Sequence, residues 1–348
     1  MAGAVITTER VIAAKAGRQV PRATGAKRRA REDVKWFCMV RMVPKHLQTG
    51  MNCNGENGVT VNRLFAFGFG DTAAALARCL RGEAWEIAGT CRTQEKQARL
   101  RNENVSTYLF SGQEAVAEGV LSGVTHILVS VPPTADGDVV IARAARAIAA
   151  NADHIAWIGY LSTTGVYGNK DGGLVTEADS VSPKSERGKR RARAEADWLA
   201  LGARTGIPVQ IFRLPGIYGP GRNQIASLRQ GKARRIVKPG HVFSRIHLDD
   251  IAQVLAASIR HPRAGAVYNV CDDEAAPPQD VVAFAADLAG LPVPPEVSVE
   301  EAGLSPMGRS FYDETKRLSN ERIKTELGVR LLYPTYREGL KALLDQGE

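Results

Sequence analysis

The sequence predicts an α/β protein with a doubly wound parallel sheet and a smaller C-terminal lobe. Two observations predict this class: short apolar runs alternate with helix-like segments from Val61 onward, and the first run leads into a glycine-rich turn. Such alternation is typical of a parallel sheet with helices on both faces. With 348 residues, 44% of them hydrophobic, the chain is long enough to bury a core of this kind.

The expected strands are short runs rich in apolar and β-branched residues. They cover residues 61–67, 85–90, 107–110, 126–131, 154–162 and 208–214. Helical candidates, with apolar residues three and four positions apart, lie at residues 72–81, 138–150 and 187–201. Right-handed crossovers between these strands produce a Rossmann-type sheet. We therefore expect a dinucleotide-binding domain over residues 61–215.

The alternation becomes irregular after residue 215. Two loops rich in Gly and Pro are followed by an expected helix at residues 250–258, for which Asp249 and Asp250 are the expected capping residues, by a strand at 266–270 and by two terminal helical stretches. We expect residues 216–348 to form a smaller substrate lobe that packs partly against the dinucleotide-binding domain.

The basic charge of the chain is concentrated in residues 1–60. This segment holds 11 of the 46 Lys and Arg but only 4 of the 37 Asp and Glu, and so carries +7 of the net charge of +9. We expect a disordered basic leader, with Met51 as an alternative start. The absence of serine before Ser106 argues against a transit peptide. The near-neutral remainder argues against nucleic acid as a partner.

Membrane and metal sites are not expected. Every apolar run is shorter than the roughly 20 residues that span a bilayer. The cysteines show no paired metal-ligand spacing and follow no secretory signal; they are Cys38, Cys53, Cys79, Cys91 and Cys271. We predict reduced thiols and a cytoplasmic location.

The turn after the first strand has the form G-x-G-x-x-A and opens an Ala-rich helix. It consists of Gly68, Phe69, Gly70, Asp71, Thr72 and Ala73. Gly68 permits the tight turn, Gly70 lets backbone N–H groups approach a diphosphate, and Ala73 allows close helix packing. The helix N-terminus favours an anion. We predict a dinucleotide site here, the alternative being ordinary turn glycines; the Asp71 carboxylate must then turn outward or cap the helix.

The end of the second strand selects between NAD and NADP. It lacks the carboxylate that would bind a ribose 2′-hydroxyl, whereas Arg92 is placed to pair with a 2′-phosphate. We predict NADP rather than NAD; the alternative is that Arg92 is a solvated surface arginine. The remaining cofactor residues are expected at the ends of the second, fourth and sixth strands: Thr90, Ser130, Val131, Pro132 and Pro215.

Two further segments leave predicted strands with related sequences. Residues 161–168 are LSTTGVYG and residues 212–222 are FRLPGIYGPGR, and the segments RIHLDDIA (245–252), VYNV (267–270) and KRLSN (316–320) follow in order. Together they resemble the extended short-chain dehydrogenase/reductases, the NAD(P)-dependent epimerase/dehydratase-like family. The resemblance covers nearly all of residues 61–348. It implies a Rossmann fold, an NAD(P) cofactor, a small-molecule substrate and a homodimer.

The resemblance also implies roles for single residues, and one expected pair is missing. Thr163 corresponds to the residue that holds the substrate carbonyl or hydroxyl. The usual Tyr-x-x-x-Lys pair is absent: its two positions hold Arg187 and Arg191, or Ser185 and Lys189 in a shifted register. Arginine stays protonated near neutral pH and cannot be the proton donor, although Arg191 can replace the lysine as a ribose contact. The chain therefore resembles the atypical branch of the family.

Tyr167 and Tyr218 are the candidates for a replacement proton donor, because both follow strand ends where ligands of open α/β sheets bind. Packing with a hydrogen-bonded hydroxyl is the alternative for each. Arg222 and Arg245 occupy loop positions that the resemblance assigns to substrate phosphate, the alternative being surface salt bridges.

Two functions remain open from the sequence. The first is an NADP-binding oxidoreductase or epimerase-like enzyme that acts on a small, anionic or nucleotide-linked substrate. The second is a non-catalytic NAD(P)-binding sensor or scaffold, which the missing Tyr/Lys pair favours. The segments around Thr163, Arg222 and Arg245 favour the enzyme, because a protein that only binds cofactor does not need them.

Overall fold

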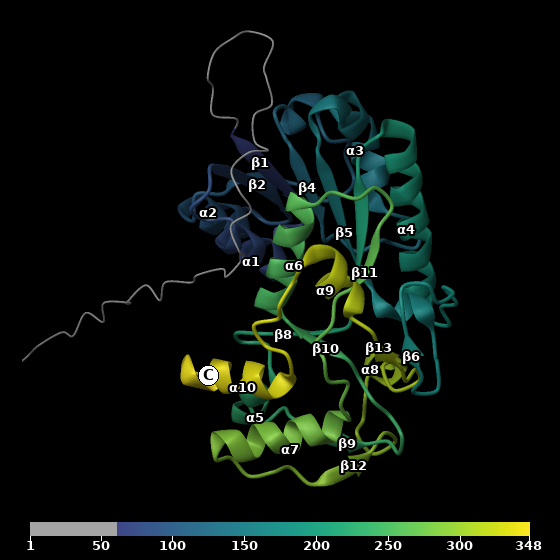
Figure 1. Ribbon diagram of the computed structural model, residues 1–348. Coiled ribbons are helices and arrows are strands. Elements are labelled where there is room, and N and C mark those ends of the chain that lie inside the picture. The colour runs from purple at the N-terminus through teal and green to yellow at the C-terminus, as the bar shows by residue number, and fades with distance from the viewer. Residues whose placement is uncertain (1–60) are drawn as a thin grey trace, which may run out of the picture. The chain divides into compact units, whose positions relative to one another are not determined.

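The computed structural model describes residues 61–348 (Figure 1). The predicted basic leader and Met51 lie outside the described residues. A seven-stranded sheet, in which every neighbouring pair is parallel, has the order β11-β7-β5-β4-β1-β2-β3. Its strands are β1 (Asn62–Phe67), β2 (Trp85–Cys91), β3 (Ser106–Leu109), β4 (His126–Val129), β5 (Trp157–Thr163), β7 (Val209–Leu214) and β11 (Val267–Asn269). This is a Rossmann order with one additional strand, which confirms the predicted fold class.

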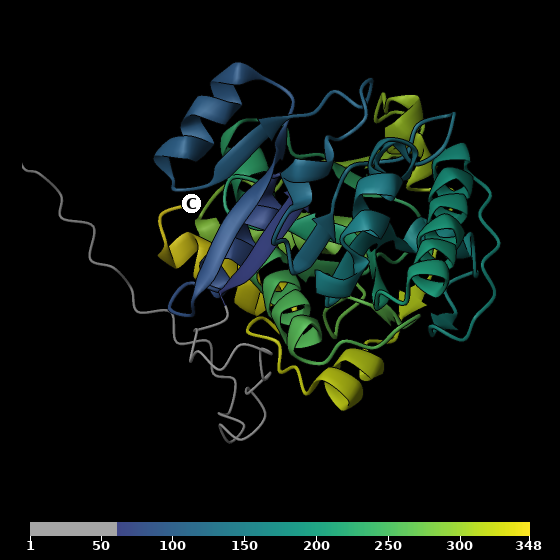
Figure 2. The same cartoon turned by 90° about the horizontal axis from the view of Figure 1, so that it is seen from above.

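Helices cover both faces of the sheet (Figures 1 and 2). One face packs against α1 (Asp71–Cys79), α2 (Gln94–Asn102), α6 (Leu248–Arg260) and α9 (Glu321–Leu327). The other packs against α3 (Val139–Ala150) and α4 (Glu186–Thr205). Strand β1 serves both cores because successive side chains alternate across a strand: Leu64 belongs to the first core and Phe65 to the second.

The two helices of the second core have clear start signals. The Asp138 carboxylate accepts the N–H groups of Val140 and Ile141 at 2.9 and 3.0 Å and so begins α3. The Ser185 hydroxyl accepts the Gly188 N–H at 3.1 Å at the start of α4. Because α4 continues to Gly206, whose φ is +76°, it is longer than the predicted segment 187–201.

Two sequence predictions are wrong in detail. The fifth strand starts at Trp157 rather than at residue 154, because Ala152–His154 form a 3₁₀ turn. Helix α6 is capped by His247, whose Nδ1 accepts the Asp249 N–H at 3.1 Å, and not by the aspartates. The Asp250 carboxylate instead accepts backbone N–H groups from residues 332 and 333.

The C-terminal part of the chain adds both to the sheet and to a separate cluster. Strand β11 and helix α6 complete the Rossmann sheet and its cover. Beside them α5 (Gln224–Arg229), α7 (Pro278–Ala289) and α10 (Tyr336–Asp345) share a core of their own. Three two-stranded parallel pairs connect these parts: β8 (Gly216–Tyr218) with β10 (Arg245–His247), β9 (Arg235–Val237) with β12 (Glu296–Ser298), and β6 (Leu174–Val175) with β13 (Arg317–Leu318). The division of the chain at residue 215 stays a prediction.

Candidate active site

The glycine-rich turn connects β1 to α1 and is held by contacts that only glycine permits at its first position. Gly68 has a φ of +80°, and a Cβ there would lie 2.8 Å from the Ser130 Oγ. The Gly68 N–H donates to the Thr90 Oγ1 and the Phe69 N–H to the Thr90 carbonyl, both at 2.8 Å. The buried Thr90 and the buried Phe69 ring therefore support the turn from behind.

The second glycine faces open space at the start of α1. A Cβ on Gly70 would meet only the Gly68 carbonyl oxygen, at 4.0 Å. No side chain caps α1, so its first N–H groups lack the partner that a capping side chain would supply. Asp71 is exposed and Ala73 is buried against the core. An open cradle with uncapped helix donors fits the diphosphate of a dinucleotide.

The other expected cofactor residues lie along the same edge of the sheet. Arg92 follows β2 and is exposed. The Ser130 Oγ, after β4, donates to the Gly68 carbonyl at 2.5 Å, and the next two residues are the half-buried Val131 and the exposed Pro132. Pro215 follows β7 and is half-buried. Parallel strands bring these positions together because their carboxyl ends share one edge.

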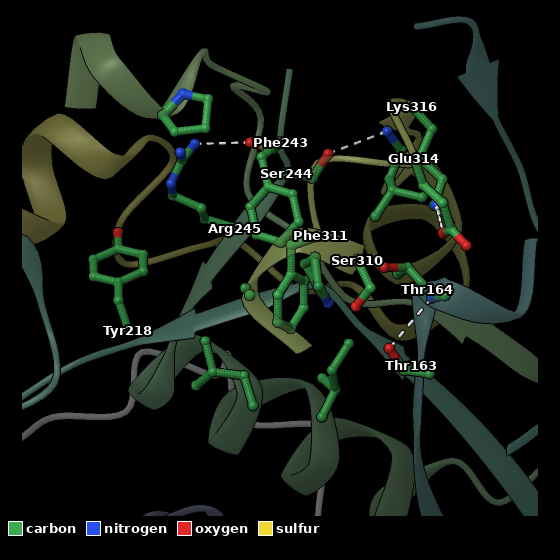
Figure 3. A pocket seen from close by; sticks show the side chains of 18 of the residues that line it. Thr163, Thr164, Tyr218, Phe243, Ser244, Arg245, Ser310, Phe311, Glu314 and Lys316 are labelled. Atoms are coloured by element: carbon green, nitrogen blue, oxygen red, sulfur yellow. Dashed lines mark hydrogen bonds and ion pairs between the residues drawn. The ribbon is translucent and has the colours of Figure 1, made fainter. Parts of the chain in front are cut away.

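A cavity of about 800 Å³ extends from this edge into the C-terminal part of the chain (Figure 3). Its wall unites eight of the predicted site residues: Thr72, Ser130, Thr163, Arg191, Pro215, Tyr218, Arg222 and Arg245. The rest lie outside the wall: Gly68, Phe69, Gly70, Asp71, Ala73, Thr90, Arg92, Val131, Pro132 and Tyr167. Except for Tyr167, these belong to the turn and strand ends that would hold the cofactor.

Thr163 ends β5 and projects into the cavity (Figure 3). Its Oγ1 accepts the Gly165 N–H at 3.3 Å, so the hydroxyl proton is available to donate to a ligand oxygen. Helix α4 packs closely on the segment after Thr163, because a Cβ on Gly188 would lie 2.8 Å from the Gly165 carbonyl. This close approach brings the start of α4 to the end of β5.

Both arginines in the positions of the missing Tyr/Lys pair line the cavity. The Arg191 Nη1 donates to the Leu161 carbonyl at 2.6 Å and to the Tyr160 hydroxyl at 3.2 Å. The Arg187 guanidinium lies over the Phe311 ring, 5.6 Å from its centroid. Lys189, the lysine of the shifted register, pairs with Glu186 on the exposed side of α4. The geometry therefore favours the register of Arg187 and Arg191.

The surroundings of the two candidate tyrosines correspond to packing rather than to proton transfer. Tyr167 is fully buried outside the cavity wall, and its hydroxyl donates to the Asn269 Oδ1 at 2.8 Å. Tyr218 lies on the opposite side of the cavity from Thr163 (Figure 3), and its hydroxyl donates to the Thr335 carbonyl at 3.5 Å. Burial raises the pKa of both phenols, which weakens them further as acids. Proximity to strand ends was a poor guide to which way these side chains point.

The two predicted substrate arginines differ in exposure. Arg245 is buried, and its Nη1 donates to the carbonyls of Phe243 and Ala276 at 2.7 and 3.1 Å. Arg222 is exposed at the cavity wall and forms no ion pair within residues 61–348. Neither side chain belongs to a surface salt bridge in the described part of the chain.

Residues 304–318 form a wall of the cavity that the sequence did not predict. Ser310, Phe311, Glu314 and Lys316 enter the cavity from this segment (Figure 3). Glu314 pairs with Lys316 at 2.8 Å, and the Lys316 Nζ also donates to the Gly168 carbonyl at 2.7 Å. The KRLSN similarity, which includes Lys316, was the one signal that pointed to this region.

The sequence of this chain matches a known protein family. A family model described as the NAD dependent epimerase/dehydratase family matches residues 74–271, more than half of the chain. The chain belongs to this family. The matched region runs from α1 through β11, so the similarity to the family extends well beyond the helix that follows the glycine-rich turn.

Individual proteins are similar over most of the chain. Protein YeeZ of Escherichia coli K12 is 28% identical over 279 residues, covering 77% of this chain and 94% of YeeZ. A functionally unknown conserved protein from Silicibacter pomeroyi DSS is 50% identical with a TM-score of 0.76, covering 82% of this chain and 99% of that one. The UDP-glucuronic acid 4-epimerase from Bacillus cereus in complex with NAD shares the fold at 17% identity, with a TM-score of 0.66 and coverage of 81% and 96%.

The described part of the chain contains neither a candidate membrane-spanning helix nor a candidate metal site. None of the helices within residues 61–348 is long and apolar enough to cross a membrane. The same residues contain no group of three or more His, Cys, Asp or Glu that could hold a metal ion.

Proposed function

We propose that this protein is an NADP-dependent oxidoreductase or epimerase-like enzyme that acts on a small, anionic or nucleotide-linked substrate. The observation that carries the proposal is the shared cavity. Its wall combines Thr72 and Ser130, beside the dinucleotide turn, with Thr163 and with arginines from outside the sheet. A cavity that joins a cofactor edge to a charged substrate wall suits a reaction between the two ligands.

The residues that would hold the cofactor are the turn from Gly68 to Ala73 and the strand ends that follow it. When bound, the nicotinamide ring would supply or accept a hydride. The uncapped start of α1 would bind the diphosphate. The exposed Arg92 supports the preference for NADP, since a guanidinium pairs well with a 2′-phosphate. Arg191 would contact the ribose while its Nη1 holds the end of β5 in place.

Thr163 would orient the reacting oxygen of the substrate. Because its Oγ1 already accepts the Gly165 N–H, the hydroxyl is directed as a donor toward the cavity. Arg187 keeps its positive charge at neutral pH and cannot take the role of the missing tyrosine in proton transfer. It would act instead as an electrostatic group for a negatively charged ligand.

Turnover by the purified full chain tests the proposal. NADPH and NADH oxidation is followed at 340 nm, and redox-neutral conversion by chromatography of the products, across a panel of carbonyl compounds and nucleotide sugars, for the native protein and for Thr163→Ala and Thr163→Val. We expect turnover with NADPH and a loss of at least about tenfold in kcat/KM in both variants. NADPH binding without any turnover would favour the sensor function, and absence of NADPH binding would contradict the proposal altogether.

A further inference from the structure

Three arginines on one wall of the cavity form no salt bridge with a described carboxylate, although the charge of Arg191 acts on the buried Asp138. Arg187 and Arg191 come from successive turns of α4, and Arg222 comes from the loop after β8. Within residues 61–348 none of them forms a salt bridge. Arg187 and Arg222 are exposed and Arg191 is half-buried, so all three guanidinium groups can be reached by an anion that enters the cavity.

The rest of the described cavity wall does not neutralise this cluster. Glu314 is its one carboxylate, and it is already paired with Lys316 at 2.8 Å. Arg245, which also lines the cavity, adds a further positive charge (Figure 3). The wall therefore carries a clear excess of positive charge, which raises the local concentration of anions.

The three charges also act on each other. Desolvation in the wall, followed by the charges of Arg191 and Arg222, lowers the pKa of Arg187. Like charges in a partly desolvated cavity are unfavourable unless something offsets them. A bound anion would remove this repulsion, whereas an empty cavity leaves it in place.

Two of the guanidinium groups are held in position before any ligand arrives. Arg191 is fixed through its Nη1 by the Leu161 carbonyl and the Tyr160 hydroxyl, which leaves its Nε and Nη2 to contact both the ribose of the cofactor and a substrate anion. Arg187 is held over the Phe311 ring at 5.6 Å. Guanidinium groups that are oriented in advance bind an oxyanion with less entropic cost than mobile ones.

We propose that Arg187, Arg191 and Arg222 form an oxyanion subsite, so that the substrate carries a phosphate or carboxylate group near the end that reacts at Thr163. The inference rests on the proposed function and deepens it, because it names the chemical class of the substrate. The arginine in the position of the usual tyrosine then has a role: it binds the charged group of the substrate next to the reacting carbon.

The test measures anion binding separately from cofactor binding and from activity. Inorganic phosphate, malonate and the uncharged malonamide are titrated calorimetrically into the full chain, with and without saturating NADPH. We expect phosphate or malonate, but not malonamide, to bind in the presence of NADPH; the stronger of the two probes identifies the charged group. Arg187→Gln and Arg222→Gln should each weaken this binding at least about tenfold, because each removes charge-assisted hydrogen bonds.

Arg193→Gln is the matched control, since Arg193 is an exposed arginine of the same helix outside the cavity wall. It should leave anion affinity unchanged. A purely structural Arg187 predicts a lower melting temperature of Arg187→Gln with unchanged anion affinity, which would overturn the inference. Arg222→Gln tests the subsite independently because its exposed side chain contributes little to folding.

NADPH affinity separates this inference from the proposed function. If the two variants lose NADPH affinity in parallel with anion affinity, the arginines serve the cofactor and the inference is overturned. If NADPH does not bind the native protein, the proposed function fails, while anion binding that depends on Arg187 and Arg222 would still establish the subsite. Equal anion affinity in native protein and both variants contradicts the subsite whatever NADPH does.

Discussion

One arginine in the core and three arginines in the cavity lie on or beside helix α4, and they differ in whether a carboxylate neutralises their charge. In the core, Arg213 and Glu195 are each about 6% exposed and pair at 2.7 Å, with the Ser162 hydroxyl donating to the same carboxylate at 2.5 Å. In the cavity, Arg187, Arg191 and Arg222 form no salt bridge within residues 61–348. The charge of Arg213 is thus compensated by a buried carboxylate, whereas a ligand can reach the charges of the three cavity arginines. The difference separates an arginine that supports the fold from arginines that, in our proposal, bind the substrate.

The largest effect is expected when the core pair is broken. Glu195→Ala leaves Arg213 buried without a counter-charge, and we expect a loss of about 3–5 kcal/mol in the free energy of unfolding. Arg187→Gln should cost at most about 1 kcal/mol, because Arg187 has no carboxylate partner and loses only its contact with the Phe311 ring. Urea unfolding of both variants measures the contrast. Equal losses would mean that the two arginine groups do not differ in the way the contacts indicate.

A second, smaller contrast lies within the dinucleotide turn. Gly68→Ala forces a side chain onto a φ of +80° and into the Ser130 hydroxyl, so we expect a loss of about 1–3 kcal/mol in stability. Gly70→Ala meets open space and should leave stability nearly unchanged while weakening NADPH binding. Melting curves and NADPH titrations are compared for the two variants. A stability loss in Gly70→Ala equal to that in Gly68→Ala would contradict the open cradle.

Buried aspartates and histidines make the free energy of unfolding depend on pH. Burial raises the pKa of Asp272 to about 8 and that of Asp250 to about 7. The folded state therefore keeps protons on these two carboxyl groups that the unfolded state has lost. Their contribution makes stability fall as pH rises toward 8. Burial lowers the pKa of His126, His241 and His247 to about 4, so stability rises with pH up to about 6.5. We expect a maximum near pH 6.5.

Asp272→Asn checks this balance, because it removes one titrating group with little change in shape. The decline between pH 6.5 and 8, at most about 1.4 kcal/mol per pH unit for one proton, should become shallower in the variant. Unfolding by urea at pH 5.5, 6.5 and 8 gives the slopes. A native protein that becomes more stable between pH 6.5 and 8 would contradict the raised pKa values.

The smallest effect is expected at Arg92, the exposed residue that follows strand β2. Arg92→Asp should reverse the preference for NADPH over NADH by lowering NADPH affinity about fivefold, equivalent to about 1 kcal/mol, because a solvated guanidinium pairs only moderately with a phosphate. Fluorescence titrations with both cofactors give the ratio, and Arg99→Asp on the exposed side of α2 serves as the control. An unchanged preference for NADPH would remove Arg92 as the determinant.

Much of the fold could be predicted because its signals are local. Strands β1, β2 and β7 lie within a residue of their predicted bounds, since apolar runs between turn residues report burial directly. Helix α2 was missed because its residues are mostly polar and it buries only Leu100. The cap of α6 was misassigned because the Asp250 carboxylate is used by residues 332 and 333, far away in the sequence.

By itself the sequence predicted the glycine-rich turn after the first strand and placed Arg187 and Arg191 where the family resemblance expects a Tyr/Lys pair, because both depend on residue type at short spacing. Only the tertiary structure decided that the Tyr167 hydroxyl is engaged by Asn269, that residues 304–318 line the cavity, and that Arg187 contacts the Phe311 ring rather than a described carboxylate. The physical reason is distance along the chain. Backbone conformation and periodicity are set by neighbours, whereas the pairing of a charge is set by whichever distant residue the fold brings within reach.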